Sequence, residues 1–418
     1  MGQNHTRRSC CIAFWLLVGL ILLLVGLLMS LILTERLLRR KVKKELVIST
    51  DSPLYYKWVE PTYHMVKQVT FFNITNARNV TVRGARPTFS EVGPFGYRLK
   101  MWKENLSFSE DNNSVNFLQN RSFHYSENHS CSDCWENSTL TLPNLALFSI
   151  FPRIPSWSFP NAVKRNLKAF LTLSEMEFSF VGYTDLLLQI LGRSQISQVP
   201  EKLAYFHELN NSHDGSFNVN TGRDDVNSAG HVLTWNSKSN LPDHFWSSNQ
   251  SKMINGSAGA KFKPFLNKGD ILFLFIAQLC RSFHMVFEKN TYYKGIPVMK
   301  FVFPYNLLNW SLPENQGFCN PQDQNKYFPN QTDSCLPSGL LDLSRCKQGA
   351  PIVMSFPHFF SARQDVVNSF PTMGPNAEEH QTYALIEPMT GAPLEFSIKF
   401  QINLKINPLD GILYEFDF

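Results

Sequence analysis

One uninterrupted apolar segment near the N-terminus limits what this chain can be. Residues 9–34 are 26 consecutive uncharged positions, rich in Leu, Ile and Val. About 20 apolar residues of helix cross a bilayer core, whereas a cleavable signal peptide has a shorter apolar region that ends in small residues. Because residues 31–33 run directly into Thr34-Glu35-Arg36, we predict an uncleaved transmembrane helix over residues 9–34. Residues 1–8 are then a cytosolic tail, and residues 35–418 lie outside the cytosol.

Glycosylation triplets support this orientation. The triplet Asn-x-Ser/Thr, with x not Pro, occurs twelve times after the apolar segment, which implies passage through the secretory pathway. Six basic residues at positions 36–44 outnumber Arg7 and Arg8, so the positive-inside bias points the other way. We give the triplets more weight, because their modification requires lumenal enzymes. The predicted acceptors are Asn73, Asn79, Asn105, Asn112, Asn120, Asn128, Asn137, Asn210, Asn249, Asn255, Asn309 and Asn330.

Charge and cysteine usage fit a secreted domain. The net charge of +5 is mild and argues against a nucleic-acid partner, which calls for a concentrated basic patch. Six cysteines follow the apolar segment and can pair in 15 ways, with oxidised pairs expected in this compartment. Cys10 and Cys11 lie at the membrane edge and are palmitoylation candidates, and the start Met1-Gly2 fits the myristoylation pattern; an unmodified tail is the alternative.

Beyond the basic stretch that ends at Lys44, strand-like patterns dominate. Residues 70–75, 271–276, 297–303 and 352–356 are β-branched or aromatic and are bounded by Gly, Pro or Asn. In residues 394–406 seven apolar positions alternate with polar ones, which predicts a single strand with one buried face. At roughly 3.4 Å per residue this strand would span about 40 Å, a length that suits a barrel or a large sheet.

Residues 161–191 break the strand pattern. Val163, Leu167, Phe170 and Leu171 have helical spacing, with Asn161 as the cap of the predicted helix. A second helix is predicted from Thr184 as cap to Leu191, with Gly192 as terminator. Three basic residues share the solvent side of the first helix, namely Lys164, Arg165 and Lys168. They are either an ordinary solvated face or a basic patch that captures a ligand.

Known catalytic patterns do not assemble in this sequence. An anchored lumenal chain is also the layout of Golgi glycosyltransferases, but no Asp-x-Asp motif occurs, which disfavours a type II transferase. His207-Glu208 lacks the second histidine of a zinc site, and Gly256-Ser257-Ala258-Gly259 lacks the spacing of a nucleophile elbow. No phosphate loop or cofactor motif is present. His380 beside Glu378 and Glu379 could form an acid–base cluster, although a polar loop before a strand is the simpler interpretation.

The pair Cys131-Ser132-Asp133-Cys134 has the spacing of a redox site. A thioredoxin-type site also requires a βαβ setting. This pair instead occurs in an Asn- and Ser-rich segment between the triplets at Asn128 and Asn137, which favours a local structural disulfide.

Three blocks of the chain read Cys280-Arg281-Ser282-Phe283, Lys294-Gly295-Ile296-Pro297 and Phe301-Val302-Phe303-Pro304. With further blocks along the chain, they resemble the class B scavenger receptor family. The blocks are collinear across nearly the whole chain, and together they are highly specific. The others include Phe71-Phe72-Asn73-Ile74-Thr75-Asn76, Glu91-Val92-Gly93-Pro94-Phe95-Gly96-Tyr97-Arg98, Met253-Ile254-Asn255-Gly256-Ser257, Gly317-Phe318-Cys319 and Ser355-Phe356-Pro357-His358-Phe359.

This resemblance implies a mainly β, α+β fold. It suggests a large antiparallel β-barrel with an internal lipid tunnel, a helical apex insertion at about residues 145–192, and the N-terminal transmembrane helix. A structural histidine is the default for His358. The resemblance also suggests the disulfides Cys280–Cys346 and Cys319–Cys335. These leave Cys131 and Cys134 to pair with each other. From the resemblance we expect relatives to continue into a second transmembrane helix, and we expect that helix to be absent from this chain.

The resemblance further implies a non-enzymatic membrane glycoprotein without a cofactor. It would bind lipids or lipoproteins through the apex patch Lys164, Arg165 and Lys168, and would conduct sterol or fatty acid through the tunnel toward the membrane. The alternative is a lysosomal trafficking receptor that binds a lumenal enzyme. The expected location is the lysosomal membrane or the plasma membrane. The apex departs from the family pattern, since the usual Trp-Gly-Tyr appears as Val181-Gly182-Tyr183.

Overall fold

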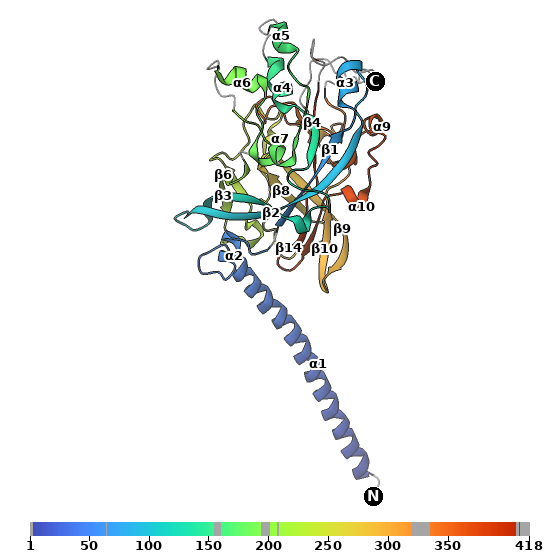
Figure 1. Cartoon of the computed structure of the whole chain (residues 1–418). Coiled ribbons are helices and arrows are strands. Elements are labelled where there is room, and N and C mark those ends of the chain that lie inside the picture. The colour runs from blue at the N-terminus through green and yellow to red at the C-terminus, as the bar shows by residue number, and fades with distance from the viewer. Residues whose placement is uncertain are drawn as a thin grey trace.

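A computed structural model provides the structure of the chain. It describes residues 3–63, 65–153, 160–193, 201–206, 209–319, 335–406 and 409, while the side chains of residues 3–13 and 191–193 lie outside the described part. A long helix leads into a body of antiparallel sheets. A cap of short helices and strands covers the end of the body that lies farthest from the helix (Figure 1).

The long helix is α1 (Gln3–Leu46), which contains both the apolar segment and the basic stretch after it. No proline interrupts it, so each N–H beyond the first turn can donate to the carbonyl four residues earlier. Over Phe14–Leu46 the helix is long and apolar enough to cross a membrane, and its most apolar stretch has a mean hydropathy of 3.1 and no buried residue. The chain enters the body at Leu46 and Ile48, which are both buried.

The first sheet has five antiparallel strands in the order β1-β2-β3-β6-β7. On β3, Val115, Phe117 and Phe123 are buried at alternate positions, because successive side chains of a strand point to opposite faces. One face of this sheet therefore points into the body. The bounds are β1 Met65–Ile74, β2 Phe89–Phe108, β3 Ser114–Tyr125, β6 Ser212–Asn220 and β7 Val232–Trp235.

The second sheet also has five antiparallel strands, in the order β14-β13-β10-β9-β8. β9 and β10 form a hairpin whose two-residue turn is Lys294-Gly295, with φ of 49° and 83°. Positive φ at both turn positions matches the twist of the strands, and glycine adopts it without strain. The bounds are β8 Ile271–Ile276, β9 Arg281–Tyr293, β10 Ile296–Val302, β13 Tyr383–Glu387 and β14 Ala392–Ser397.

The prediction of a single strand over residues 394–406 is wrong. β14 ends at Ser397 and pairs with β13, whereas β15 (Gln401–Leu404) pairs with β12 (Ile352–Ser355) in a third sheet that also contains β11 (Leu341–Asp342). Between them, the Thr382 hydroxyl accepts from the Lys399 backbone N–H (2.9 Å) and donates to its carbonyl (3.3 Å). A side chain thus replaces the strand partner where the segment passes from one sheet to another.

The cap combines a two-stranded sheet with short helices. β4 (Thr139–Pro143) pairs with β5 (Phe170–Ser174), and the predicted first helix is reduced to α5 (Asn161–Lys164), with Pro160 rather than Asn161 at its N-cap. Phe170 and Leu171 lie opposite Pro143 and Leu142, so strand pairing overrides the helical spacing of these residues. The other helices here are α4 Leu145–Ile150, a π-helix at Glu177–Val181 and α6 Leu186–Arg193.

The second predicted helix forms, but its cap lies one residue later in the chain than predicted. The Asp185 carboxylate accepts from the Leu188 backbone N–H (2.9 Å), so Asp185 rather than Thr184 is the cap of α6. The helix also includes Gly192, which was predicted to end it. The remaining short helices are α2 Tyr55–Val59, α3 Ala77–Arg83, α7 Asn249–Lys252, α8 Pro313–Gln316, α9 Gln364–Ser369 and α10 Ala377–His380.

The described strands therefore form four separate antiparallel sheets rather than one continuous ladder. The predicted antiparallel β architecture with short helices and an N-terminal apolar helix is confirmed at this level. The largest core cluster lies between the two five-stranded sheets and includes Phe117, Phe217, Phe283 and Phe301. A second cluster fills the cap around Leu147 and Leu187.

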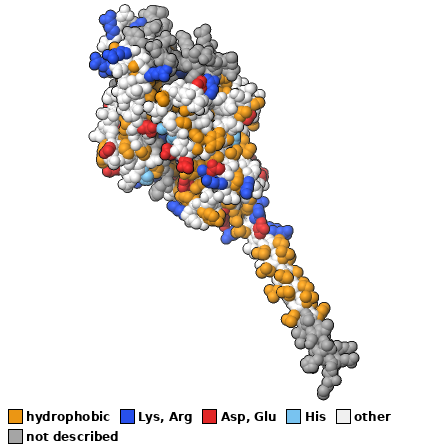
Figure 2. Space-filling view, turned by 90° about the vertical axis from the view of Figure 1, so that its right-hand side faces the viewer, with side chains coloured by type: hydrophobic (Ala, Val, Ile, Leu, Met, Phe, Trp, Pro, Cys, Tyr) orange, Lys and Arg blue, Asp and Glu red, His pale blue; other side chains and the backbone are white. Residues whose placement is uncertain are grey.

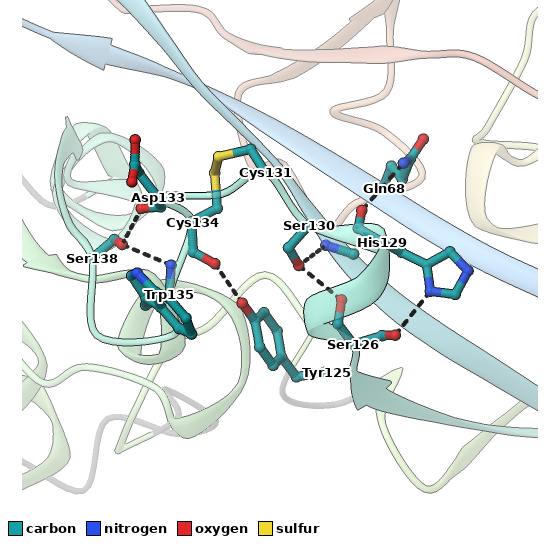
Figure 3. Close-up of a disulfide and its surroundings, with 11 residues drawn as sticks. Gln68, Tyr125, Ser126, His129, Ser130, Cys131, Asp133, Cys134, Trp135 and Ser138 are labelled. Atoms are coloured by element: carbon teal, nitrogen blue, oxygen red, sulfur yellow. Dashed lines mark hydrogen bonds between the residues drawn. A yellow bond between two sulfur atoms is a disulfide. The ribbon is translucent and has the colours of Figure 1, made fainter.

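Three disulfides are present, and they are the pairs that the family resemblance suggests: Cys131–Cys134, Cys280–Cys346 and Cys319–Cys335. Figure 3 shows the first pair and its neighbours. The Tyr125 hydroxyl donates to the Cys134 carbonyl, and the Ser138 hydroxyl accepts from the Trp135 backbone N–H (3.0 Å). Cys134 is buried, and no helix begins at Cys131. This setting fits the structural interpretation, since a thioredoxin-type pair starts a helix within a βαβ unit.

Candidate functional site

A large cavity, partly open to solvent, lies among the sheets of the body. Its volume is about 3240 Å³, and residues of both five-stranded sheets, the third sheet and the cap line it. Ligand pockets for drug-sized molecules are commonly about 300–1,000 Å³. A cavity of this size can hold a long-chain lipid, or more than one.

The inner face of the first sheet makes one wall. Leu99, Met101 and Lys103 line the cavity from β2, and Phe117, Gln119, Arg121 and Phe123 line it from β3. These are alternate residues of two neighbouring strands, with Met101 opposite Arg121 and Lys103 opposite Gln119. The period of two brings them all to one face. The wall is therefore apolar, with a polar band across its middle.

The segment that changes sheets makes another part of the wall. Every residue from Pro393 to Ile406 lines the cavity. Because the strand is interrupted after Ser397, the strict alternation of inward and outward side chains is lost. Ile398 and Ile402 remain largely exposed, although both are aliphatic. These side chains present apolar surface to the cavity. A bound lipid could cover that surface.

Three lysines that line the cavity have a lowered pKa. Burial lowers the pKa of Lys67 to about 8, of Lys103 to about 7 and of Lys261 to about 8, because a low-dielectric environment disfavours the charged form. The Lys103 Nζ donates to the Trp58 carbonyl (2.7 Å), and the Lys261 Nζ donates to the Leu46 carbonyl. The Lys67 Nζ instead lies 4.1 Å from the ring centroid of Phe206 and 5.4 Å from that of Phe123.

One ion pair is built into this wall. Arg121 from β3 pairs with Asp214 from β6, and the Gln278 side-chain amide donates to both Asp214 carboxylate oxygens, at 3.0 and 2.9 Å. The sequence-based interpretation missed Lys67, Lys103, Arg121 and Asp214. A signal existed on β3, where Gln119 and Arg121 occupy inward positions of an alternation that otherwise reads Val115, Phe117 and Phe123. Polar residues at core positions of a strand indicate a function or a polar cavity.

Two histidines stack at another part of the wall. The rings of His358 and His380 have centroids 4.2 Å apart, and the His358 Nε2 lies 3.2 Å from a Glu91 carboxylate oxygen. The His380 Nδ1 accepts from the Asn376 backbone N–H (2.9 Å), which places the proton of neutral His380 on Nε2. Glu379 lies 3.9 Å from that nitrogen, whereas Glu378 is exposed and makes no ion pair with His380. The structure thus joins His380 to His358 and Glu91 rather than to Glu378.

The histidine pair predicts a stability that depends on pH. Burial, followed by the neighbouring His358, lowers the pKa of His380 below its ordinary value. Glu91, Glu379 and Lys399 are the other charged groups that act on it. As pH falls below about 6.5, the unfolded chain binds a proton at this histidine before the folded chain does, so the free energy of unfolding decreases.

We expect the thermal midpoint of the full chain to fall between pH 7.5 and pH 5. A His380→Gln variant should show a smaller fall across the same range, measured by differential scanning fluorimetry. His124, which is exposed on β3, supplies the control variant His124→Gln. Equal pH dependence in all three proteins would contradict the assignment to His380.

The predicted apex residues lie apart from the cavity. Lys164, Arg165 and Lys168 are not among the residues that line it; Arg165 and Lys168 are exposed, and Lys164 is half-buried. Within the described ranges none of the three makes an ion pair with an acidic side chain. Figure 2 shows Lys and Arg side chains gathered at the end of the molecule opposite the apolar helix. The three residues stay a predicted ligand patch.

The glycosylation triplets differ in exposure. Asn79, Asn105, Asn112, Asn128, Asn137 and Asn249 are exposed, and Asn73, Asn210, Asn255 and Asn309 are half-buried. Asn120 is only 9% exposed, and its Nδ2 is buried without a hydrogen-bond partner, so the folded structure has no room for a glycan there. The prediction at Asn120 is therefore not compatible with the structure. Asn330 and the side chains of Cys10 and Cys11 lie outside the described residues.

This difference can be measured by gel mobility. An Asn128→Gln variant should lose one N-glycan and run faster than the unaltered chain, because Asn128 is exposed in a short 3-10 helix. An Asn120→Gln variant should run unchanged. Deglycosylation of all three proteins should bring them to the same position, and a mobility shift for Asn120→Gln would contradict the buried placement.

Known proteins match almost the whole chain. A model described as the CD36 family matches residues 17–414. Mouse "Lysosome membrane protein 2" is 30% identical over 417 residues, which cover 99% of this chain and 83% of that protein. The human protein of the same name is 29% identical over 423 residues. Pig "Scavenger receptor class B member 1" is 30% identical over 424 residues, which cover 99% of this chain and 79% of the relative.

Proposed function

The chain belongs to the CD36 family, and from this premise we propose that it is a membrane glycoprotein receptor that binds lipid inside its body. The observation that carries the proposal is the cavity of about 3240 Å³ between the sheets, with mostly apolar walls. Apolar surface that faces a cavity of this size is stabilised when an acyl chain or a sterol covers it.

The membrane attachment rests on α1. Its exposed side chains from Phe14 to Leu33 are almost all apolar (Figure 2), and in water they would form an unfavourable hydrophobic surface. In a bilayer the same surface is solvated by lipid, and the helix satisfies its own backbone hydrogen bonds. We place the body on the lumenal or extracellular side because the exposed triplets lie there. One relative is named a lysosome membrane protein and another a scavenger receptor, and we propose the lysosomal membrane or the cell surface as the location of this chain.

The cap is where we propose that ligands are captured. It carries Lys164, Arg165 and Lys168 at the end opposite α1, and a basic patch raises the local concentration of anionic particles. Lipoproteins and anionic lipid surfaces have the matching charge. Sterol or fatty acid would then move through the cavity toward the membrane at α1. This route is the lipid tunnel that the family resemblance implies.

Lipid analysis of the purified protein tests the proposal. The full chain, purified in a mild detergent, should contain sterol or acyl lipid at about one or more molecules per chain by native mass spectrometry and lipid extraction. A protein without bound lipid would contradict the lipid-binding function. If a lumenal protein copurifies in stoichiometric amount and lipid is absent, the alternative function as a trafficking receptor is favoured instead.

A further inference from the structure

The cavity wall around Arg121 carries more positive than negative charge. Lys67 from β1, Arg121 from β3 and Lys347 from the segment between β11 and β12 all line the cavity. Arg121 interacts electrostatically with both lysines. The only carboxylate recorded against this group in the described part of the chain is that of Asp214. The three cations are therefore matched by one anion.

Arg121 is incompletely satisfied. It is 5% exposed, and its Nε has no hydrogen-bond partner among the described residues. Its ion-pair partner Asp214 also receives two hydrogen bonds from Gln278. A buried guanidinium N–H without an acceptor is costly, because the group has lost its hydrogen bonds to water. An acceptor in the cavity beside Arg121 would remove that cost.

Lys67 also has no anionic partner among the described residues. Within that part of the chain its ammonium group makes neither an ion pair nor a hydrogen bond, and it lies against the rings of Phe123 and Phe206. Burial, followed by Arg121, lowers the pKa of Lys67 to about 8, so the side chain still carries its charge at neutral and acidic pH. Burial and Arg121 also lower the pKa of Lys347. Both shifts have the direction expected for cations held together without a counterion.

We propose that Lys67, Arg121 and Lys347 form an oxyanion subsite of the cavity, which takes the carboxylate or phosphate head of an anionic amphiphile. An oxyanion between these groups would accept from the Arg121 Nε and from the lysine ammonium groups, in charge-assisted hydrogen bonds. This inference rests on the proposed lipid-binding function. It adds the polar end of the ligand, which the apolar walls alone do not define.

The surroundings favour an amphiphile over a free anion. Leu99 and Met101 line the cavity on the neighbouring strand, and Met101 lies directly opposite Arg121 in the ladder. Phe123 and Phe206 border Lys67. An acyl chain attached to the oxyanion would cover these side chains, and burial of apolar surface contributes roughly 0.8 kcal/mol per methylene. Inorganic phosphate would leave the same surface uncovered.

Binding measurements on the full chain test the subsite. The delipidated protein in detergent is titrated with oleate, with oleyl alcohol and with inorganic phosphate, by displacement of a fluorescent fatty acid. In a Lys67→Gln variant we expect the affinity for oleate to fall about tenfold, the loss expected for one charge-assisted hydrogen bond. The affinity for oleyl alcohol should stay unchanged. Lys289→Gln is the matched control, since Lys289 is an exposed lysine on β9 that does not line the cavity.

The outcomes separate this inference from the proposed function. A selective loss of oleate affinity in Lys67→Gln, at an unchanged melting temperature, supports the subsite. Unchanged oleate affinity, or an equal loss for oleate and oleyl alcohol, overturns the subsite and leaves lipid binding intact. Displacement of oleate by inorganic phosphate at comparable affinity assigns the site to a free anion and overturns the amphiphile. If the unaltered chain binds neither oleate nor oleyl alcohol, the proposed function and the subsite fail together.

Discussion

An Ile402→Trp variant should bind and transfer lipid roughly ten- to a hundred-fold less well than the unaltered chain. Ile402 on β15 lines the cavity and is 51% exposed, so a larger side chain there projects into the space and not into packed core. Forcing a bound lipid against an added ring system costs about 1–3 kcal/mol, and each 1.4 kcal/mol is about tenfold in affinity. The measurement is uptake of a fluorescent sterol or fatty acid by the full chain.

Ile271 provides a matched control for this variant. It is an isoleucine on a strand, β8, and is 54% exposed, but it does not line the cavity. Ile271→Trp should therefore leave lipid uptake unchanged. If both variants reduced uptake equally, the effect would come from altered expression or surface properties, and the cavity would not be the binding site.

Removal of the Cys280–Cys346 disulfide should destabilise the body more than removal of the Cys131–Cys134 disulfide. The bond joins residues separated by 66 positions, and restricting a loop of that length contributes about 4 kcal/mol in the chain-entropy description. Cys280 is 3% exposed, and its carbonyl accepts from the Trp246 indole N–H (2.6 Å) in the main core. The double variant Cys280→Ala/Cys346→Ala should melt on the order of 10 °C lower, by circular dichroism.

The pair Cys131–Cys134 is the internal comparison. Its residues are three positions apart, so the same description predicts a contribution of only about 2 kcal/mol. Cys131→Ala/Cys134→Ala should therefore lower the melting temperature by about half as much. If the melting temperature fell equally in the two double variants, loop length would not determine how much each disulfide stabilises the body.

Patterns that depend on neighbouring residues were predictable from the sequence. The uninterrupted apolar segment and the basic stretch form one helix because helix hydrogen bonds are local and no proline intervenes. The strand patterns at residues 271–276 and 352–356 correspond to β8 and β12. The redox interpretation of Cys131 and Cys134 was already disfavoured by the loop-like composition around them.

Errors arose where a local pattern suits two structures. Phe170 and Leu171 have helical spacing, yet they also present apolar surface in a strand, and the availability of β4 as a partner decided in favour of β5. The alternation of residues 394–406 is that of one strand, but it is equally compatible with two strands in different sheets. Thr382, which lies far from Lys399 in the sequence, supplies the hydrogen bonds at the break.

The residues of the candidate site are brought together almost entirely by tertiary structure. Lys67, Arg121 and Lys347 lie on segments far apart in the chain, and only the pairing of β1, β2 and β3 and the position of the β11–β12 segment bring them to one cavity. The stacking of His358 on His380 has the same origin.

By itself the sequence determined the apolar N-terminal helix, the antiparallel β character and the family, because each follows from local periodicity or from collinear motifs. The tertiary structure alone decided which polar side chains face the cavity, which triplet is buried and where the last strand changes sheets. The physical reason is that burial and electrostatic interaction depend on distance in space, and residues remote in sequence set those distances.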